Sequence, residues 1–267
     1  AMARRELAEA MTMFYRSLGN TGMQVSALGF GTVKLGRSEG VKYPQAFNIP
    51  DDNEARALLN LARDLGINLL DTAPAYGNSE ERLGKLLKDD RKQWLICSKV
   101  GEEFIDGESS FNFSEQHTRL SVERSLRRLK TDYIDMVLVH SDGNDLDIIN
   151  NHAALQTLAD LKQRGWIRAF GMSTKTVEGG LLAAAQSDVV MVTYNLNEGD
   201  DVAVLDYCRD NNRGVLIKKA LASGHRCDGD AVAEALAMIF AHPAASAAII
   251  GTINPEHLRD NVGKLPK

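Results

Sequence analysis

The sequence predicts an α/β fold, a (β/α)8 TIM barrel whose bottom is capped by an N-terminal β-hairpin. Eight short apolar runs alternate along the chain with amphipathic segments of about 10–15 residues, as in repeated strand–helix units. Each run is almost continuously apolar, which is typical of parallel strands that are buried on both faces. Eight strands can close into a barrel, and 267 residues match the size of about 250 that is usual for this fold. A doubly wound open sheet is the alternative.

The predicted strands coincide with the apolar runs. They span residues 27–31, 67–71, 94–99, 133–140, 167–172, 189–194, 214–218 and 247–251. The predicted helices lie near residues 52–65, 79–88, 114–129, 150–164, 177–186, 200–211, 230–241 and 255–263. Start and stop signals support several of these helices, because Ser114 is typical of an N-cap, and Gly66 and Gly165 are typical of helix ends.

One segment lies outside the count of strand–helix units. Residues 14–28, FYRSLGNTGMQVSAL, predict a β-hairpin that turns at residues 19–22 and covers the bottom of the barrel. No linker or low-complexity tract interrupts the chain. We therefore expect residues 1–267 to form a single barrel domain with a short C-terminal end.

Composition and charge narrow the class of partner. The net charge is −5, the pI is near 5.7 and the 31 Lys and Arg residues are scattered, so we expect no nucleic-acid partner. Cys97, Cys208 and Cys227 have no CxxC spacing, which argues against a zinc site or disulfide framework and for a reducing compartment. The chain has no signal-peptide-like start and no long apolar run. These features predict a cytoplasmic monomer or small homo-oligomer with no membrane contact and a small-molecule partner.

Two common nucleotide-binding motifs and one zinc-protease motif are missing from the sequence. The segment GFGTVKLG (29–36) has Lys34 where the dinucleotide fingerprint GxGxxG needs its third glycine. The segment GNSEERLGK (77–85) has six residues between its glycines, where a P-loop needs four. HExxH does not occur. The chain therefore carries no sequence signature of these three kinds of site.

Polar residues stand at the C-terminal ends of three successive predicted strands. Asp71 ends the second strand, Lys99 the third and His140 the fourth. In a (β/α)8 barrel these ends meet at the mouth, where the active sites of this fold lie. Tyr76, in a Pro/Gly-rich turn five residues after Asp71, can lean back over the same rim. Each residue alone is more often structural than catalytic, but the four together predict an active site.

These four side chains suit reversible proton transfer to a carbonyl oxygen. An ammonium about 4 Å from a phenol contributes roughly 4 kcal/mol at an effective dielectric of 20, so we expect Lys99 to lower the pKa of Tyr76 and make it a general acid. Asp71 would neutralise and orient Lys99. A neutral His140 would donate a hydrogen bond to the substrate oxygen. The alternative chemistry is a Schiff base on Lys99, which a neighbouring carboxylate disfavours because it keeps the amine protonated.

The chain resembles the aldo-keto reductase superfamily from about residue 14 to residue 261. The resemblance is carried by LGFGTVKLG, NLLDTAPAYGNSEERLGKLL, ICSKVG, SVERSLRRLKTDYIDMVLVH, LKQRGWIRAFGMST, VTYN and IIGTINPEHLRDNV. It implies an NAD(P)H-dependent enzyme that transfers a hydride to an aldehyde or ketone, with NADPH as the usual cofactor and NADH as the other. It assigns the catalytic roles to Tyr76, Lys99, Asp71 and His140, without a metal. The alternative is a non-catalytic regulatory subunit of the same fold that binds a nicotinamide nucleotide.

The resemblance also implies a set of cofactor-binding residues. They are Gly31, Thr32, Val33, Asp71, Ser173, Lys218, Lys219, Leu221, Gly251, Thr252 and Asn261. The backbone of residues 31–33 would lie near the nicotinamide, and Ser173 would bind its carboxamide. Thr252 and Asn261 match the segment that binds the adenosine phosphate, where the N–H groups of a helix start favour phosphate.

The nicotinamide region departs from the family pattern. Thr174 replaces an Asn, and Met191 replaces a Gln, which removes one contact to the carboxamide. Lys218 and Lys219 replace an aromatic residue and a Ser. These two lysines either form a solvated surface pair or meet the pyrophosphate as charged donors.

The adenosine and substrate regions differ as well. Gly251 and His257 replace basic residues that favour NADPH in many relatives, and Arg259 can compensate. The loops at 35–50 and 100–113, which mix aromatic and charged residues, are expected to shape the substrate pocket. Because the long C-terminal loop of many relatives is missing, we expect this pocket to be open or to be closed by a partner chain.

Overall fold

Eight parallel strands close into a barrel in the computed structural model, which describes residues 13–41, 46–221 and 229–267. In order along the chain the barrel strands are β3 (Leu28–Gly31), β4 (Leu69–Asp71), β5 (Leu95–Val100), β8 (Ile134–His140), β9 (Ile167–Ser173), β10 (Val189–Thr193), β11 (Gly214–Lys218) and β12 (Ala247–Ile250). The last strand pairs with the first, with Ile250 opposite Phe30. This pairing confirms the predicted barrel and rules out the open sheet.

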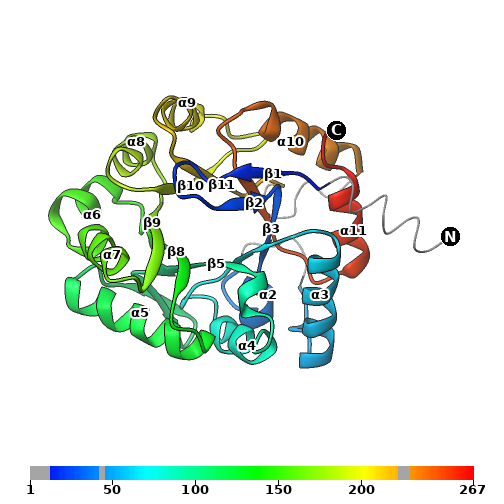
Figure 1. The fold of residues 1–267 in the computed structure, drawn as a ribbon, viewed down its shortest axis with the longest axis horizontal. Helices are drawn as coiled ribbons and strands as arrows, with labels where there is room; N and C mark the ends of the chain where they lie inside the picture. Colours follow the sequence, from blue (N-terminus) through cyan, green and yellow to red (C-terminus); the bar gives the residue numbers. More distant parts are fainter. Residues whose placement is uncertain (1–12, 42–45, 222–228) are drawn as a thin grey trace.

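The helices lie outside the ring of strands, as Figure 1 shows. They are α2 (Val33–Gly36), α3 (Asp52–Asp64), α4 (Ser79–Leu86), α5 (Glu115–Leu129), α6 (Asp145–Asn151), α7 (Ala154–Gln163), α8 (Val177–Gln186), α9 (Val202–Asn211), α10 (Gly229–Ala241) and α11 (Pro255–Gly263), with a 3-10 turn η1 (Arg91–Gln93). Ser114 caps α5 as predicted, because its side chain accepts a hydrogen bond from the His117 N–H. Gly66 and Gly165 both have positive φ at the ends of α3 and α7.

Besides the short α2 and η1, which were not predicted, two parts of the chain differ from the predicted elements. The helix predicted at 150–164 begins only at Ala154 as α7, and a separate helix, α6, ends at Asn151, because the backbone is extended at His152. The predicted loop at 100–113 contains an antiparallel hairpin of β6 (Glu102–Ile105) and β7 (Glu108–Phe111). Its turn is formed by Asp106 and Gly107, both with positive φ, and Asp-Gly is a strong sequence signal for such a turn.

The N-terminal hairpin of β1 (Tyr15–Ser17) and β2 (Gln24–Ser26) closes the bottom of the barrel, as predicted. Leu18 and Val25 are fully buried and belong to the same apolar cluster as side chains from inside the barrel. The turn touches the start of β11 so closely that a Cβ on Gly19 would lie 2.3 Å from the backbone nitrogen of Gly214. Glycine is therefore required at position 19.

Two further expectations concern cysteines and membranes. Cys97 and Cys208 are free and buried, and Cys227 lies outside the described residues. Among the helices of the described ranges, none has both the length and the apolar character needed to cross a bilayer.

A buried carboxylate near the start of β8 joins three neighbouring parts of the barrel. Asp135 is 1% exposed and accepts hydrogen bonds from the backbone N–H of Ile96 at 2.8 Å and from Arg91 and Arg168, both at 2.9 Å. Both carboxylate oxygens have charged donors, so burial of this charge is compensated.

We expect Asp135→Asn to lower the free energy of unfolding by about 3 kcal/mol, because it leaves two guanidinium groups without their counter-charge. Urea titration followed by circular dichroism measures this change. Asp210→Asn, at a side chain that is 64% exposed, is the control and should stay within about 0.5 kcal/mol of the unmodified protein. Equal stability of the two variants would show that the network contributes little.

Candidate active site

An ion pair between two neighbouring strands forms the base of the candidate site. Nζ of Lys99 lies 2.6 Å from Oδ1 of Asp71 and also donates to the carbonyl oxygen of Thr72 at 2.9 Å. Lys99 is 1% exposed and Asp71 is 4% exposed. Burial is the largest effect and acts to lower the pKa of Lys99, but the Asp71 carboxylate, with Tyr76 and Cys97, raises the pKa above its usual value. Lys99 is therefore a protonated amine, a poor nucleophile for Schiff-base chemistry.

Tyr76 lies over this ion pair because its loop packs backbone to backbone against α2. Nζ of Lys99 is 5.0 Å from the centroid of the Tyr76 ring. The ring meets the imidazole of His140 edge to face, with 6.2 Å between centroids. A Cβ on Gly36 would lie 2.1 Å from the Tyr76 carbonyl oxygen, and one on Gly77, where φ is +60°, would lie 1.9 Å from the Gly36 carbonyl oxygen. Both positions therefore need glycine for the phenol to reach the mouth.

The pKa of the Tyr76 phenol is raised above its usual value. The prediction from the sequence that Lys99 would lower this pKa is therefore wrong. Burial is the largest cause, and the Lys99 ammonium only partly opposes it. Asp71 neutralises Lys99 and itself raises the pKa of Tyr76. The phenol is therefore protonated at neutral pH. Lys99 still favours the phenolate that remains after the proton has been transferred.

His140 ends β8 beside a carboxylate that the sequence analysis did not select. Its Nδ1 lies 3.0 Å from Oε2 of Glu102 on β6. Burial lowers the pKa of His140, and Glu102 opposes this effect only in part, so the imidazole is neutral at pH 7. Burial acts to raise the pKa of Glu102, but His140, Ser109 and Arg37 together bring it down to about 2. In the sequence, Glu102 was only one of several charged residues in the loop at 100–113.

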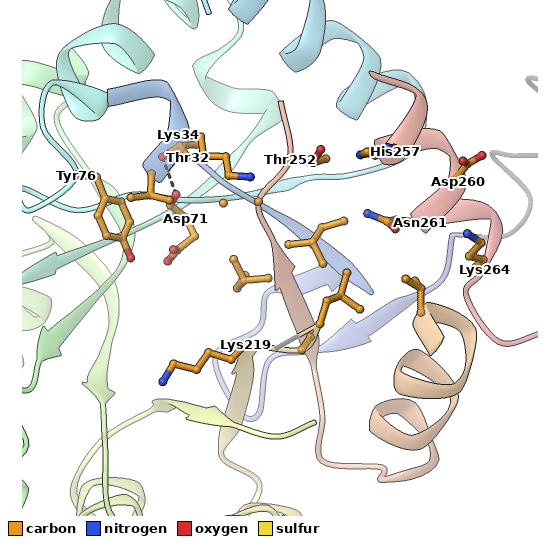
Figure 2. Close-up of a pocket in the computed structure, with 18 residues that line it drawn as sticks. Thr32, Lys34, Asp71, Tyr76, Lys219, Thr252, His257, Asp260, Asn261 and Lys264 are labelled. Atoms are coloured by element: carbon orange, nitrogen blue, oxygen red, sulfur yellow. Dashed lines mark hydrogen bonds between the residues drawn. The ribbon is translucent and has the colours of Figure 1, made fainter. Parts of the chain in front are cut away.

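A cavity of about 290 Å³ runs from this group of residues toward α11. Figure 2 shows Tyr76 and Asp71 at one end and Asn261 and Lys264 at the other, with the Lys219 side chain below and directed toward the Tyr76 end. The predicted cofactor residues that line it are Gly31, Thr32, Val33, Asp71, Lys219, Leu221, Gly251, Thr252 and Asn261. The structure thus brings nine of the eleven predicted residues to one elongated cavity.

The other two predicted cofactor residues, Ser173 and Lys218, contact each other outside the described lining of this cavity. Nζ of Lys218 donates to Oγ of Ser173 at 2.9 Å and to the carbonyl oxygen of Thr174 at 2.8 Å. Burial, followed by the charges of Lys219 and Lys175, lowers the pKa of Lys218 to about 7. Lys218 is therefore not part of a solvated surface pair, which was one of the two interpretations from the sequence.

The charges along the cavity fit an anionic, elongated ligand. Lys34, Lys264 and His257 line it together with Lys219, and the first two were not among the residues predicted from the sequence. Arg259, which was expected to compensate for lost basic residues, is not in the described lining. The two carboxylates of the lining are Asp260 and Asp71, and Asp71 is already bonded to Lys99. These donors fit the phosphates of a nicotinamide dinucleotide.

The described parts of the chain contain no cluster of side chains that could bind a metal ion. Within residues 13–41, 46–221 and 229–267, no three His, Cys, Asp or Glu side chains are placed to hold one ion.

Curated proteins with similar sequences are oxidoreductases by name. Aldo-keto reductase YhdN of Bacillus subtilis is 31% identical over 219 residues, which cover 79% of this chain and 63% of that protein. L-galactose dehydrogenase of Arabidopsis thaliana is 32% identical over 222 residues, which cover 78% and 66% of the two chains. An NADH-specific methylglyoxal reductase of Escherichia coli is 30% identical, with 78% and 67% covered. The chain thus spans less than two thirds of the length of the first two relatives.

Solved structures and a family profile extend this similarity. A Pseudomonas aeruginosa protein assigned to the aldo-keto reductases has 57% sequence identity and a TM-score of 0.87, with 94% of this chain and 93% of that chain covered. The holo form of a Bacillus halodurans aldo-keto reductase has 26% identity and a TM-score of 0.79, with 94% and 90% covered. The profile of the Aldo/keto reductase family matches residues 27–231, well over half of the sequence. This chain therefore belongs to the Aldo/keto reductase family.

Proposed function

We propose that this chain is an NAD(P)H-dependent reductase of small aldehydes or ketones. The observation that carries the proposal is the meeting of Asp71, Tyr76, Lys99 and His140 at the mouth of the barrel, next to a cavity with cationic walls. Relatives whose names specify a methylglyoxal reductase and an L-galactose dehydrogenase support small oxygenated substrates. The family membership supports a nicotinamide cofactor.

When bound, the cofactor supplies the hydride that reaches the carbonyl carbon. Tyr76 donates its phenolic proton to the carbonyl oxygen, and the resulting phenolate is stabilised by the Lys99 ammonium. Asp71 holds Lys99 in place through the 2.6 Å contact. In the reverse direction the phenolate takes the proton of the alcohol. The apolar surroundings that raise the pKa of Tyr76 also keep its proton in place until the substrate oxygen is beside it.

The cavity residues have separate roles in holding the cofactor. Thr252, Asn261 and Lys264, at the α11 end, would bind the adenosine phosphate. Lys219 would meet the pyrophosphate between the two ends as a charged donor. Lys218 and the Ser173 hydroxyl to which it donates would lie beside the nicotinamide carboxamide.

Replacement of Tyr76 by Phe tests the chemical role directly. We expect Tyr76→Phe to lower kcat for methylglyoxal by at least about 100-fold, because the general acid is lost, while the Kd for NADPH changes less than about twofold. Turnover is followed by NADPH absorbance and binding by fluorescence. Tyr133→Phe, in which the ring keeps its contact with Arg91 at the other end of the barrel, is the matched control. Unchanged turnover in Tyr76→Phe would exclude the phenol as the acid, and tight binding without any turnover by the unmodified protein would favour a regulatory subunit.

The cofactor preference depends on the cation at the α11 end. We propose NADPH as the preferred cofactor, with Lys264 beside its 2′-phosphate. We expect Lys264→Met to raise the Kd for NADPH about tenfold and the Kd for NADH less than about threefold, since a hydrogen bond to a charged group contributes about 1.5–3 kcal/mol. Fluorescence titrations with both nucleotides measure this, with Arg259→Met as the control outside the described lining. An equal rise in the Kd for both nucleotides would show that Lys264 does not contact the 2′-phosphate.

Cofactor binding should depend on pH through Lys218. Because its pKa is about 7, its positive charge is present below pH 7 and is lost as the pH rises above it. We expect the affinity for NADH, which has no titrating 2′-phosphate, to fall severalfold from pH 6 to pH 8. Isothermal titration calorimetry should show that Lys218→Met removes this dependence and that His257→Gln keeps it. A pH dependence that survives in Lys218→Met and disappears in His257→Gln would assign it to the histidine instead.

A further inference from the structure

The β6–β7 hairpin holds the Glu102 carboxylate against the imidazole of His140. Side chains alternate along a strand, so Glu102 and Glu103 point to opposite sides of β6. Glu103 pairs with Arg124 and lies 3.4 Å from His117, which anchors the outer side of the hairpin on α5. Glu102 is on the inner side. Its Oε1 accepts a hydrogen bond from the Ser109 hydroxyl at 2.9 Å, and its Oε2 faces His140.

The charges around the imidazole decide where its single proton lies. With a pKa of about 2, Glu102 is a carboxylate at any physiological pH and can only accept hydrogen bonds. An unprotonated Nδ1 at 3.0 Å would set a lone pair against this oxygen, whereas a protonated Nδ1 is attracted to it. The contact lies outside regular hydrogen-bond angles, so the attraction is mainly electrostatic. The Lys99 ammonium, joined below pH 7 by the Lys218 ammonium, disfavours a second proton on the ring.

Other ionisable groups near this pair do not change the preference. Arg37 stacks on the Phe104 ring at 3.5 Å and stabilises the Glu102 carboxylate. The Tyr76 phenol is uncharged and meets the imidazole through a ring contact. Glu102 is thus the anion that the structure places directly against His140.

We propose that Glu102 is a positioning residue that holds His140 as the Nδ1–H tautomer, so that Nε2 is a hydrogen-bond acceptor at neutral pH. The sequence analysis expected a neutral His140 to donate to the substrate oxygen, and that role needs the opposite tautomer. An alcohol hydroxyl can donate to an acceptor and a carbonyl oxygen cannot. One consequence rests on the proposed function: His140 favours the alcohol form of the substrate over the carbonyl form.

Multiple-bond ¹H–¹⁵N spectra of the ¹⁵N-labelled full chain at pH 7.5 identify the protonated ring nitrogen. The chain has six histidines, and the signals that disappear in His140→Asn assign this one. We expect the Nδ1–H tautomer to predominate. In Glu102→Gln the Nε2–H fraction should rise, and the pKa of His140 should fall by about one unit, because the attraction of the carboxylate is lost. Glu108→Gln, at an exposed position of the same hairpin, should leave both unchanged.

Two outcomes would overturn the inference. One is a predominant Nε2–H tautomer in the unmodified protein, a measurement that needs no variant. The other is an unchanged tautomer and pKa in Glu102→Gln. In an active enzyme, Glu102→Gln should also raise KM for an alcohol about threefold more than KM for the matching aldehyde. The spectra need no turnover, so the two proposals can fail separately. If the protein reduced no carbonyl compound but showed the Nδ1–H tautomer, the proposed function would be refuted and the role of Glu102 would be supported.

Discussion

Closure of eight parallel strands into a ring is the constraint on which the candidate site depends. Since β12 pairs with β3, every strand has two neighbours and all C-terminal ends reach one rim. A carboxylate from β4 and an ammonium from β5 can then be buried together, although either alone in that place would cost several kcal/mol. The register that sets Asp71 opposite Cys97 brings Lys99 into contact range. The Tyr76 ring, carried by the loop after β4, then lies over the Lys99 ammonium of this ion pair.

Around this ion pair, the mouth is built by backbone packing and by an added hairpin. The loop of Tyr76 lies on α2 with no room for a Cβ at Gly36 or Gly77, so the phenol is positioned by main-chain contact rather than by side-chain packing. Next to this segment, the β6–β7 hairpin is fixed to α5 and brings Glu102 to His140. The ends of the barrel strands thus supply Asp71, Lys99 and His140, and the segments that follow them add Tyr76 and Glu102.

Local charge in the cavity differs from the charge of the whole chain. The net charge of −5 is compatible with a small-molecule partner, yet the cavity is lined by three lysines and has one carboxylate that is not already paired with Lys99. A phosphate-bearing ligand is attracted by these nearby groups, because distant surface charges are screened within about 10 Å at moderate salt. Composition therefore indicates the class of partner only coarsely, and the arrangement of a few cations along one cavity refines it.

The sequence by itself determined the eight strands, the capping hairpin and the positions of Asp71, Lys99 and His140 at strand ends, because apolar periodicity and the last polar residue of a strand are local signals. The Asp-Gly turn of β6–β7 is also local and could have been found. Only the tertiary structure decided which way Glu102 points, that Lys264 reaches the cavity and that the pKa of Tyr76 rises. Burial and contacts between distant segments set these properties, and neither can be read from residue spacing.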